Sequence, residues 1–599
     1  MRDMKSILMS FAAVLASASA FADKVDTVWN AQKARASRLR GENAARVKAL
    51  GAADKVTWFA VPAMSDVMRL EDTWPVDGDF AAPVRCVLAQ DEWESCSFEL
   101  FATEDLKDVE LSVELGVAND LKVVKRWFQN GNGWVSYFDD VGLKMTPELL
   151  LHDENLIRVD EGDRPGNWAR VRKGGKDDYV WISAPKGLDA GAFNPYDEGF
   201  ADAEKLQPVA LRKDAFKQFF LTLHAAKDQK PGVYRGKVNV RRGAQALCQI
   251  PLEVRVLPFR LPLPGGYRDP GQAFMYSVMG AMPSLPQLTE GFGGDEAKAK
   301  VCFRAWLQSV YDHSIFYAPG VGPDNEWCVP MLKEIGFPLD PVFGHCFVPW
   351  FGLNFGGRMS YQQLMSAKDA AEECHAFYQR LLGHNNVMCG HGDEQGTAFV
   401  TAHREFFKYF EKYGLRIGCA GHDALMYKGG YAYGYYPMGG EPQELEKMRP
   451  WLEMGAYPTG FYASQHTGSE NPQFTRNQHG LQSYLNGLTM AFNYEFAIGS
   501  FNDRVNELYK PMVIAYANGQ GLMETIEYAG FREGCDDIRY ATQLKLLAAE
   551  CAASQSLEAK VTGKKALHFL AMLPRDRLDL NYVRMEMIAY ILKMMDALK

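Results

Sequence analysis

Helical and apolar segments alternate along the second half of the chain, from about residue 270 to residue 553. Residues 296–313, 366–383 and 402–414 have the apolar spacing of amphipathic helices, and a short apolar run follows each of them. Such alternation is typical of parallel strands that are joined by crossover helices. The second half of the chain is therefore predicted to be a β/α domain.

The apolar runs of this region predict seven strands and a weaker eighth one. They are residues 273–278, 314–320, 385–392, 416–421, 459–464, 488–496 and 521–528, with the weaker one at 344–351. Eight parallel strands close a barrel, so a (β/α)8 TIM-type barrel is the predicted fold. A doubly wound open sheet is the alternative.

The first half of the chain has a different pattern. Short segments rich in β-branched and aromatic residues, many of them alternating apolar with polar, are separated by turn residues from about residue 54 onward. They predict an antiparallel β-sandwich. A stretch rich in Pro and Gly at 257–270 marks the boundary between the two halves. The predicted domains are a signal peptide at 1–22, a helical lead-in at 23–50, the β-sandwich at 51–262, and the barrel with C-terminal helices at 263–599.

The N-terminus has the features of a cleavable secretory signal. Arg2 and Lys5 precede an apolar run, and Ala20-Phe21-Ala22 provides a small-x-small cleavage site. The run is too short to span a bilayer, and no later segment is long and apolar enough to do so. We expect a secreted or periplasmic protein that is cut after Ala22.

The net charge and the spacing of the cysteines limit which partners and cofactors are expected. The formal net charge of −9 argues against nucleic acid as a partner. The 11 cysteines form no CxxC pair and fit no zinc pattern, so neither a metal nor another cofactor is expected. Export permits disulfides, and Cys86 and Cys96 are candidates for one.

Two adjacent carboxylates, Asp393 and Glu394, directly follow the apolar run at 385–392. Acids there also suit the N-terminus of the following helix, which is the structural alternative. Catalytic groups of β/α barrels gather at the C-terminal ends of strands, however, and other predicted strand ends also carry acidic or aromatic side chains. The candidate substrate-binding residues are His391, Trp350, Tyr317, His422, Tyr435, Tyr436, Tyr462, Tyr494 and Glu527.

Paired carboxylates at barrel strand ends suggest cleavage of glycosidic bonds. Side chains of neighbouring residues diverge, so Asp393 and Glu394 cannot simply face each other across a sugar. In one mechanism the 2-acetamido oxygen of the substrate attacks the anomeric carbon, Asp393 orients the acetamido N–H, and Glu394 is the general acid. In the other, Glu394 is the acid/base and Glu495 is a direct nucleophile.

The sequence resembles glycoside hydrolase family 123, the β-N-acetylgalactosaminidase family, and its uncharacterised bacterial relatives. The resemblance lies in 88–113, 217–262, "GHGDEQG" at 390–396 and "IEYAGFREGCDDIRY" at 526–540. It implies a β-sandwich followed by a β/α barrel, and retaining, substrate-assisted cleavage in which Asp393 and Glu394 match the catalytic pair. Gln395 stands where many relatives have proline. Within the last segment, charged side chains are predicted to form structural ion pairs: Arg532, Glu533, Asp536, Asp537 and Arg539.

The resemblance and the aromatic residues suggest an oligosaccharide or glycoconjugate substrate. Residues 427–440, which include Tyr435 and Tyr436, are predicted to form an aromatic loop over the site, or else an ordinary Gly-rich surface loop. The leading hypothesis is a secreted exo-acting β-N-acetylhexosaminidase, with N-acetylgalactosamine favoured. The alternative from another class is a carbohydrate-binding protein that has lost catalysis on the same fold. The sequence leaves the oligomeric state open.

Overall fold

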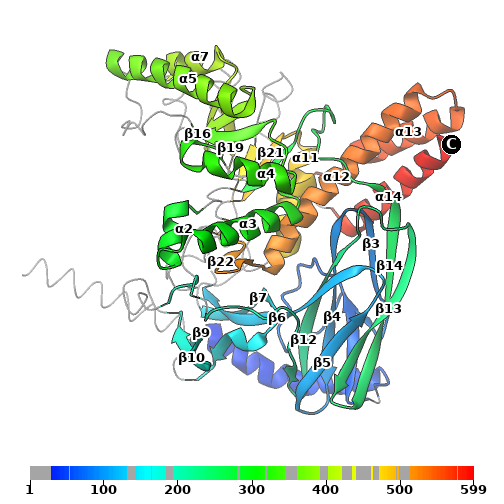
Figure 1. Cartoon of the computed structure of the whole chain (residues 1–599). Coiled ribbons are helices and arrows are strands. Elements are labelled where there is room, and N and C mark those ends of the chain that lie inside the picture. The colour runs from blue at the N-terminus through cyan, green and yellow to red at the C-terminus, as the bar shows by residue number, and fades with distance from the viewer. Residues whose placement is uncertain are drawn as a thin grey trace, which may run out of the picture.

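The computed structural model describes most of the chain (Figure 1). The described residues are 28–52, 54–130, 143–162, 165–183, 193–197, 199–278, 283–317, 320–345, 360–390, 403–420, 435–439, 460–462, 471–493, 496–497, 513–575 and 578–599. The first element is a helix at residues 28–49. No helix within the described ranges combines the length and the apolar character that crossing a membrane requires.

Two sheets form the N-terminal β-region. The larger has the order β2 (Asp79–Phe80), β1 (Val56–Val61), β4 (Trp93–Ala102), β12 (Ala215–His224), β6 (Ala118–Asn130) and β7 (Leu143–Leu151). The second has the order β11 (Val209–Leu211), β5 (Leu106–Glu114), β13 (Gly232–Arg242), β14 (Gln245–Arg260) and β3 (Val84–Gln90). Neighbouring strands are antiparallel except β14 and β3.

The two sheets share one apolar core, as in a β-sandwich. Buried and exposed residues alternate along much of β14, as expected of a strand with one face in a core. Phe98 and Leu221 of the larger sheet pack in the same cluster as Leu88, Val238 and Val254 of the second sheet. A small third sheet has the order β10 (Lys176–Trp181), β9 (Gly166–Lys173) and β8 (Ile157–Asp160), which follows the 3-10 helix η1 (Glu154–Leu156).

A seven-stranded parallel sheet forms the centre of the second half. Its order is β15 (Met275–Val278), β21 (Met490–Asn493), β20 (Gly460–Tyr462), β19 (Tyr435–Gly439), β18 (Arg416–Ala420), β17 (Val387–Gly390) and β16 (Val342–His345). The first strand pairs with the last, and the others follow in sequence. A doubly wound sheet reverses its order in the middle, so this topology excludes that alternative.

The parallel sheet is strongly curved. The rings of Phe343 on β16 and Phe492 on β21 lie 4.7 Å apart, although four strands separate β16 from β21. In a flat sheet these two strands would be roughly 24 Å apart, at about 4.8 Å for each step between neighbours. The sheet is therefore at least a half-barrel whose interior holds these two rings. Among the described residues β15 and β16 do not pair, so closure into an eight-stranded barrel is not confirmed.

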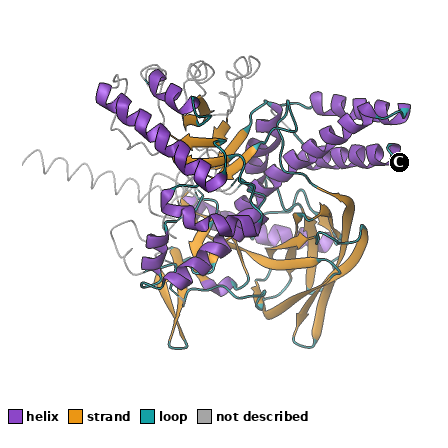
Figure 2. Ribbon diagram, turned by 45° about the horizontal axis from the view of Figure 1, so that its top comes forward, coloured by secondary structure: helices purple, strands orange, loops and turns teal. Residues whose placement is uncertain are grey.

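Helices surround this sheet (Figure 2). In chain order they are α2 (Leu285–Gly291), α3 (Glu296–Asp312), η2 (Pro323–Cys328), α4 (Val329–Ile335), α5 (Tyr361–Leu382), α7 (Arg404–Glu411), α10 (Pro472–Asn477), the π-helical turn η3 (Gln478–Gln482), α11 (Ser483–Leu485), α12 (Ile526–Ala553), α13 (Leu557–Ala571) and α14 (Leu580–Ala597). Helices α5 and α7 pack on the outer side of β16, β17 and β18 through Cys374, Phe377 and Phe410. The last three helices pack on one another beside the sandwich (Figure 1).

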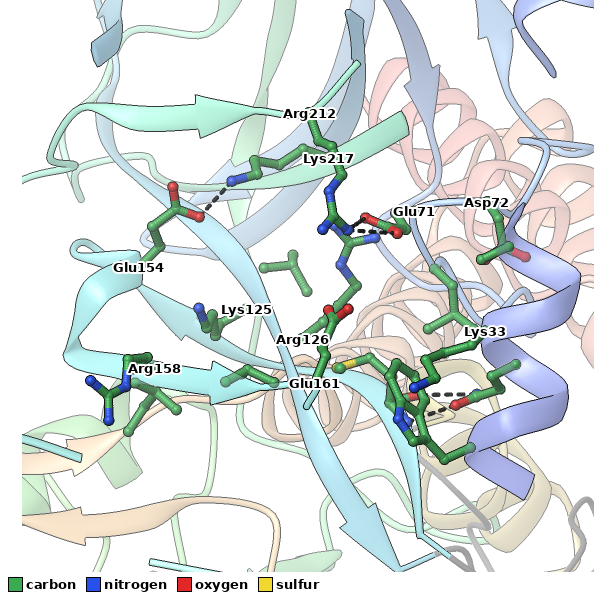
Figure 3. A pocket seen from close by; sticks show the side chains of 18 of the residues that line it. Lys33, Glu71, Asp72, Lys125, Arg126, Glu154, Arg158, Glu161, Arg212 and Lys217 are labelled. Atoms are coloured by element: carbon green, nitrogen blue, oxygen red, sulfur yellow. Dashed lines mark hydrogen bonds and ion pairs between the residues drawn. The ribbon is translucent and has the colours of Figure 1, made fainter. Parts of the chain in front are cut away.

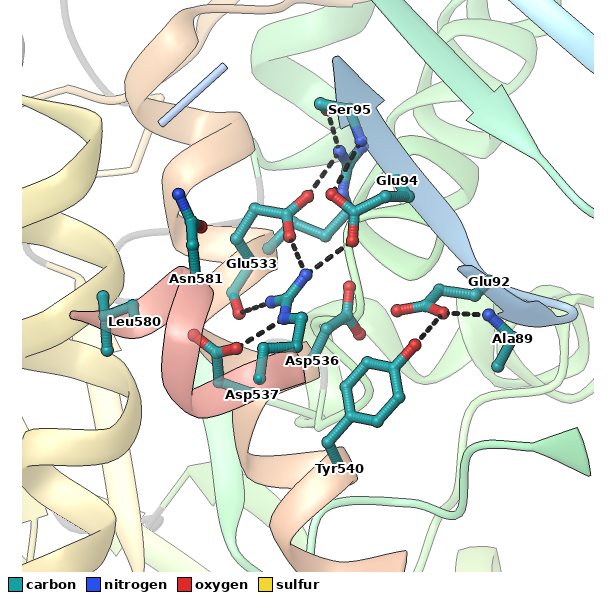
Figure 4. A network of polar contacts seen from close by, with 12 residues as sticks. Ala89, Glu92, Glu94, Ser95, Glu533, Asp536, Asp537, Tyr540, Leu580 and Asn581 are labelled. Carbon is teal, nitrogen blue, oxygen red and sulfur yellow. Dashed lines mark hydrogen bonds and ion pairs between the residues drawn. The ribbon is translucent and has the colours of Figure 1, made fainter. Parts of the chain in front are cut away.

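The segment at 526–540 forms a buried ion-pair network, as predicted (Figure 4). Arg584 of α14 reaches Asp537 at 2.6 Å and Glu533 at 2.6 Å, and it also pairs with Glu94 of β4. Although burial opposes ionisation, the guanidinium groups of Arg584 and Arg532 lower the pKa of Glu533 to about 2. The network joins α12 and α14 to the sandwich.

The remaining members of this network follow the same pattern. Arg539 pairs with Asp536 at 2.7 Å, and Arg476 of α10 pairs with Asp537 at 2.7 Å. Tyr540 donates a hydrogen bond to Glu92 of the sandwich at 2.7 Å. Each of the four buried guanidinium groups of the network pairs with at least one carboxylate, which compensates for the removal of these charges from water.

Six of the eight predicted strands overlap with strands of the parallel sheet, and two do not. The described part of 314–320 forms no strand. The run at 521–528 does not join the parallel sheet, because Gly521–Met523 is strand β23, which pairs with β22 (Tyr516–Asn518) in an antiparallel hairpin. The signal that the prediction missed is Thr525, whose hydroxyl accepts a hydrogen bond from the N–H of Tyr528 and so begins α12.

Two further predictions are corrected by the structure. Residues 435–439 of the predicted aromatic loop form β19 inside the parallel sheet, because β18 and β20 provide backbone partners on both sides. Cys86 and Cys96 are free thiols rather than a disulfide. A hydrogen bond with Cys96 and burial together raise the pKa of the Cys86 thiol well above its usual value.

Candidate functional site

The C-terminal edge of the parallel sheet is the candidate site, because the strand ends meet there. β17 ends at Gly390, shortly before Asp393 and Glu394 in the chain. Its residues alternate between two environments: Met388 belongs to the main core, whereas Val387 and Cys389 pack under α5 and α7. β17 is thus fixed on both faces and by pairing with β16 and β18. It provides a rigid support for whatever follows it.

Most of the predicted site residues lie outside the described residues. They are His391, Asp393, Glu394, Trp350, His422, Tyr494 and Glu495. Their roles therefore stay predictions. The backbone of Tyr435, Tyr436 and Tyr462 is placed on β19 and β20, two neighbouring strands of the sheet, while the directions of these three side chains are not described.

Tyr317 and Glu527 are placed by the structure, and neither is at the end of a strand. Tyr317 follows α3 and is buried in the main core beside Phe316. Glu527 lies in the first turn of α12, fully buried, where it accepts a hydrogen bond from the Thr475 hydroxyl at 3.2 Å. The prediction of a strand end at Glu527 is wrong, and its role in substrate binding stays a prediction.

Two polar residues of the sheet were not singled out by the sequence. Asn493, the last residue of β21, is fully buried, and among the described residues its side-chain amide has no hydrogen-bond partner. The Ser277 hydroxyl on β15 is also buried without a partner in the described part of the chain. Ser277 is in register with Phe492, so it faces the curved interior of the sheet. The sequence feature that could have identified them is a single amide or hydroxyl side chain within an otherwise apolar strand, since buried polar groups normally have hydrogen-bond partners.

A cavity of about 330 Å³ lies between the sandwich and α3, where several titratable groups meet. Burial raises the pKa of Asp312 to about 6 and lowers that of His313 to about 4. Despite burial, Lys122 lowers the pKa of Glu524 to about 2, and the two groups are 2.7 Å apart. Because α3 leads back to the N-terminal side of the sheet, these groups lie away from the strand ends and are suited to stability rather than catalysis.

The described residues hold no group of three or more His, Cys, Asp or Glu side chains arranged to bind a metal.

Comparison with solved structures connects this architecture to a known fold. A family 123 glycoside hydrolase from Clostridium perfringens, whose structure was reported with the details of glycolipid glycan hydrolysis, aligns with a TM-score of 0.59. The alignment covers 90% of this chain and 97% of that chain, at 10% sequence identity. This chain shares the fold of that glycoside hydrolase. The resemblance read from the sequence is thus confirmed at the level of the fold.

Other comparisons add little. A family 5 xyloglucanase from Bacteroides ovatus aligns with a TM-score of 0.25 and 7% identity, which is too low to bear on the fold. No family model matches the sequence. No curated protein matches it either.

Proposed function

We propose that the protein is an exported retaining β-N-acetylhexosaminidase that acts on a terminal N-acetylgalactosamine or a closely related 2-acetamido sugar. The observation that carries the proposal is that Asp393 and Glu394 follow, three and four residues on in the chain, the end of β17 in a curved parallel sheet. The fold shared with a glycoside hydrolase supports the reaction class. The predicted signal peptide at 1–22 supports export, to the periplasm or beyond.

The proposal includes a closed (β/α)8 barrel within residues 263–599, preceded by the sandwich at 51–262. Closure requires a strand between β15 and β16, and residues 314–321 are the candidate. Val321 forms an isolated parallel bridge with Gly344 of β16, which supports this assignment. The buried side chains of Ile315, Phe316 and Tyr317 support it as well.

In the proposed mechanism the substrate supplies its own nucleophile. The 2-acetamido oxygen attacks the anomeric carbon as Glu394 protonates the departing glycosidic oxygen, which yields an oxazolinium ion. Asp393 holds the acetamido N–H and stabilises the positive charge that develops. A water molecule then attacks the anomeric carbon and opens the oxazolinium ring, and Glu394 takes a proton from this water. Glu394 is thereby protonated again, the 2-acetamido group is restored, and the sugar keeps its anomeric configuration.

The two mechanisms are separated by mutation and by an inhibitor. Asp393→Asn should lower kcat by about 10²-fold or more, because a neutral amide stabilises the developing charge poorly, whereas Glu495→Gln should cost far less. A thiazoline analogue of the intermediate should inhibit strongly, since it resembles the species that the site stabilises. Steady-state kinetics on an aryl 2-acetamido glycoside measures both effects. Covalent labelling of Glu495 by an activated fluorosugar would replace this mechanism with direct nucleophilic attack.

A further inference from the structure

A second cavity lies in the N-terminal half, between the helix at 28–49 and strands β6, β7 and β8 (Figure 3). Its volume is about 570 Å³, which is within the usual range of small-molecule sites. All of its lining residues belong to the lead-in helix, the sandwich and its small third sheet, so it is separate from the strand ends of the parallel sheet.

The lining of this cavity is mainly positive. It carries seven cationic side chains against four carboxylates. The cations are Lys33, Arg40, Lys125, Arg126, Arg158, Arg212 and Lys217, and the carboxylates are Glu71, Asp72, Glu154 and Glu161. The excess is notable in a chain whose formal net charge is −9. It indicates a local preference for anions.

Most of the carboxylates are already engaged. Glu71 accepts from Arg212 at 3.1 Å and also pairs with Arg40. Glu154 pairs with Lys217 at 2.5 Å. Asp72 pairs with Arg35, outside the cavity, at 2.8 Å. These carboxylates therefore have little capacity to neutralise the other cations.

Four lining cations have no ion pair with the described residues. Lys33 and Arg158 lie over aromatic rings, and the other two are Lys125 and Arg126, which are adjacent on β6. Neither has an ion pair or a side-chain hydrogen bond with any of the described residues, yet both are partly buried. Burial lowers the pKa of Lys125 to about 8, and it also lowers the pKa of Arg126. A protein normally compensates charges that are removed from water, so two such cations facing one cavity point to an anionic ligand.

The rest of the lining suits a sugar better than a bare inorganic ion. Leu70, Val124 and Ile157 supply apolar surface, and Asn155 and Gln32 supply amides. The volume exceeds what a sulfate or phosphate ion would fill. Mixed apolar and amide surfaces match the apolar faces and hydroxyl edges of a sugar ring, while the cations match an acidic substituent.

We propose that this cavity binds an anionic carbohydrate, a sugar unit that carries a sulfate ester or a carboxylate, with Lys125 and Arg126 as its charge partners. This site is independent of the proposed hydrolytic site. It would hold an acidic glycan against the sandwich.

Calorimetric titration of the full-length mature protein at low salt tests this site. The probes are glucose 6-sulfate, glucuronate, glucose and inorganic sulfate, which all lack a 2-acetamido group and so avoid the proposed catalytic site. At least one of the two acidic sugars should bind, about tenfold or more tighter than glucose and than inorganic sulfate. Which acidic sugar binds identifies the sulfate or the carboxylate as the recognised group.

Variants assign any binding to the cavity. Arg126→Gln and Lys125→Gln should each weaken binding of the acidic sugar by about tenfold. Arg235→Gln, an exposed cation on β13 of the same sandwich, is the matched control and should bind like the wild type. Because the first two variants remove half-buried cations whose pKa burial lowers and which form no ion pair with the described residues, their melting temperatures should not fall, so lost binding would not reflect unfolding. Absence of binding by both acidic sugars, equal binding of glucose or sulfate, or unchanged affinity in both variants would overturn the proposal.

Discussion

Two histidines are held neutral by burial. His479 in η3 is fully buried, and its Nδ1 lies 3.2 Å from the carbonyl oxygen of Thr475. His313 stacks on Tyr528 with ring centroids 3.6 Å apart. Burial lowers the pKa of each ring to about 4. Both rings therefore stay uncharged in the folded protein under conditions in which the unfolded chain binds a proton.

This difference predicts a stability change with pH. The pKa of each ring in the folded protein lies below its unfolded value of 6.5. The stability that comes from burying a neutral ring is therefore complete above pH 6.5 and is lost as the pH falls towards 4. Each histidine should lower the free energy of unfolding by up to about 3 kcal/mol over this pH range. Urea unfolding at several pH values should give a shallower pH dependence for His479→Gln than for the wild type. The exposed His568→Gln serves as control, and an unchanged dependence in His479→Gln would contradict this account.

At the scale of elements, α12 lies so close to α10 and η3 that no side chain fits at two positions of their contact, Gly530 and Gly534. A Cβ atom at Gly534 would lie 2.7 Å from the hydroxyl oxygen of Tyr276 and 2.9 Å from the carbonyl oxygen of Arg476. A Cβ atom at Gly530 would lie 2.5 Å from the carbonyl oxygen of Pro472. The two glycines are one helical turn apart, so together they make a smooth stripe on α12.

Substitution of these glycines should distinguish the effect of helix packing on stability from the effect of helix propensity. Gly534→Ala should destabilise the protein by about 1–3 kcal/mol, because the added methyl group forces the helices apart. Gly41→Ala, in the helix at 28–49, meets no atom within 4 Å and should instead stabilise it by about 0.5–1 kcal/mol. Chemical denaturation measures both values. Equal effects of the two substitutions would show that the close approach does not matter.

Arg584 is the side chain on which the docking of α14 depends. It contacts Glu94, Glu533 and Asp537, all buried, so Arg584→Met would leave Glu94 without an ion-pair partner among the described residues. Glu533 and Asp537 would each keep only one arginine, Arg532 and Arg476 respectively. The expected cost is about 3–5 kcal/mol in the free energy of unfolding. The exposed pair of Arg304 and Glu334 provides the control, since Arg304→Met should cost less than about 1 kcal/mol. A small effect at Arg584 would mean that apolar contacts alone hold α14.

At the scale of the whole molecule, the order of the two halves could be predicted from the sequence. The change from period-two patterns to alternating helices and strands marks it, and most parallel strands coincide with apolar runs. Residues 435–439 could not be identified as a strand, because Pro437 and Gly439 disfavour a strand and only pairing with β18 and β20 places them in the sheet. Glu527 was misplaced because Thr525 is both a β-former and a helix cap.

The candidate site was predictable only in part. Strand β17 is where the sequence places it, and this fixes the point in the sheet from which Asp393 and Glu394 follow. Asn493 was not predicted as a site residue, because a single amide within an apolar run belongs to no recognisable sequence motif. The ion pairs of 526–540 could be predicted from the sequence, since charged side chains inside an apolar segment must be compensated when they are buried.

Hydrolysis of β-N-acetylgalactosaminides by the wild type and by Glu394→Gln is the measurement that tests the central claim most directly. The wild type should cleave both an aryl glycoside with a nitrophenyl leaving group and an alkyl glycoside. Glu394→Gln should lose about 10²–10⁴-fold in kcat/KM on the alkyl glycoside, whose leaving oxygen needs a proton, and much less on the nitrophenyl one. Equal losses on both substrates would contradict the role of Glu394 as the general acid. A wild type that cleaves neither these substrates nor other 2-acetamido glycosides would contradict the proposed function itself.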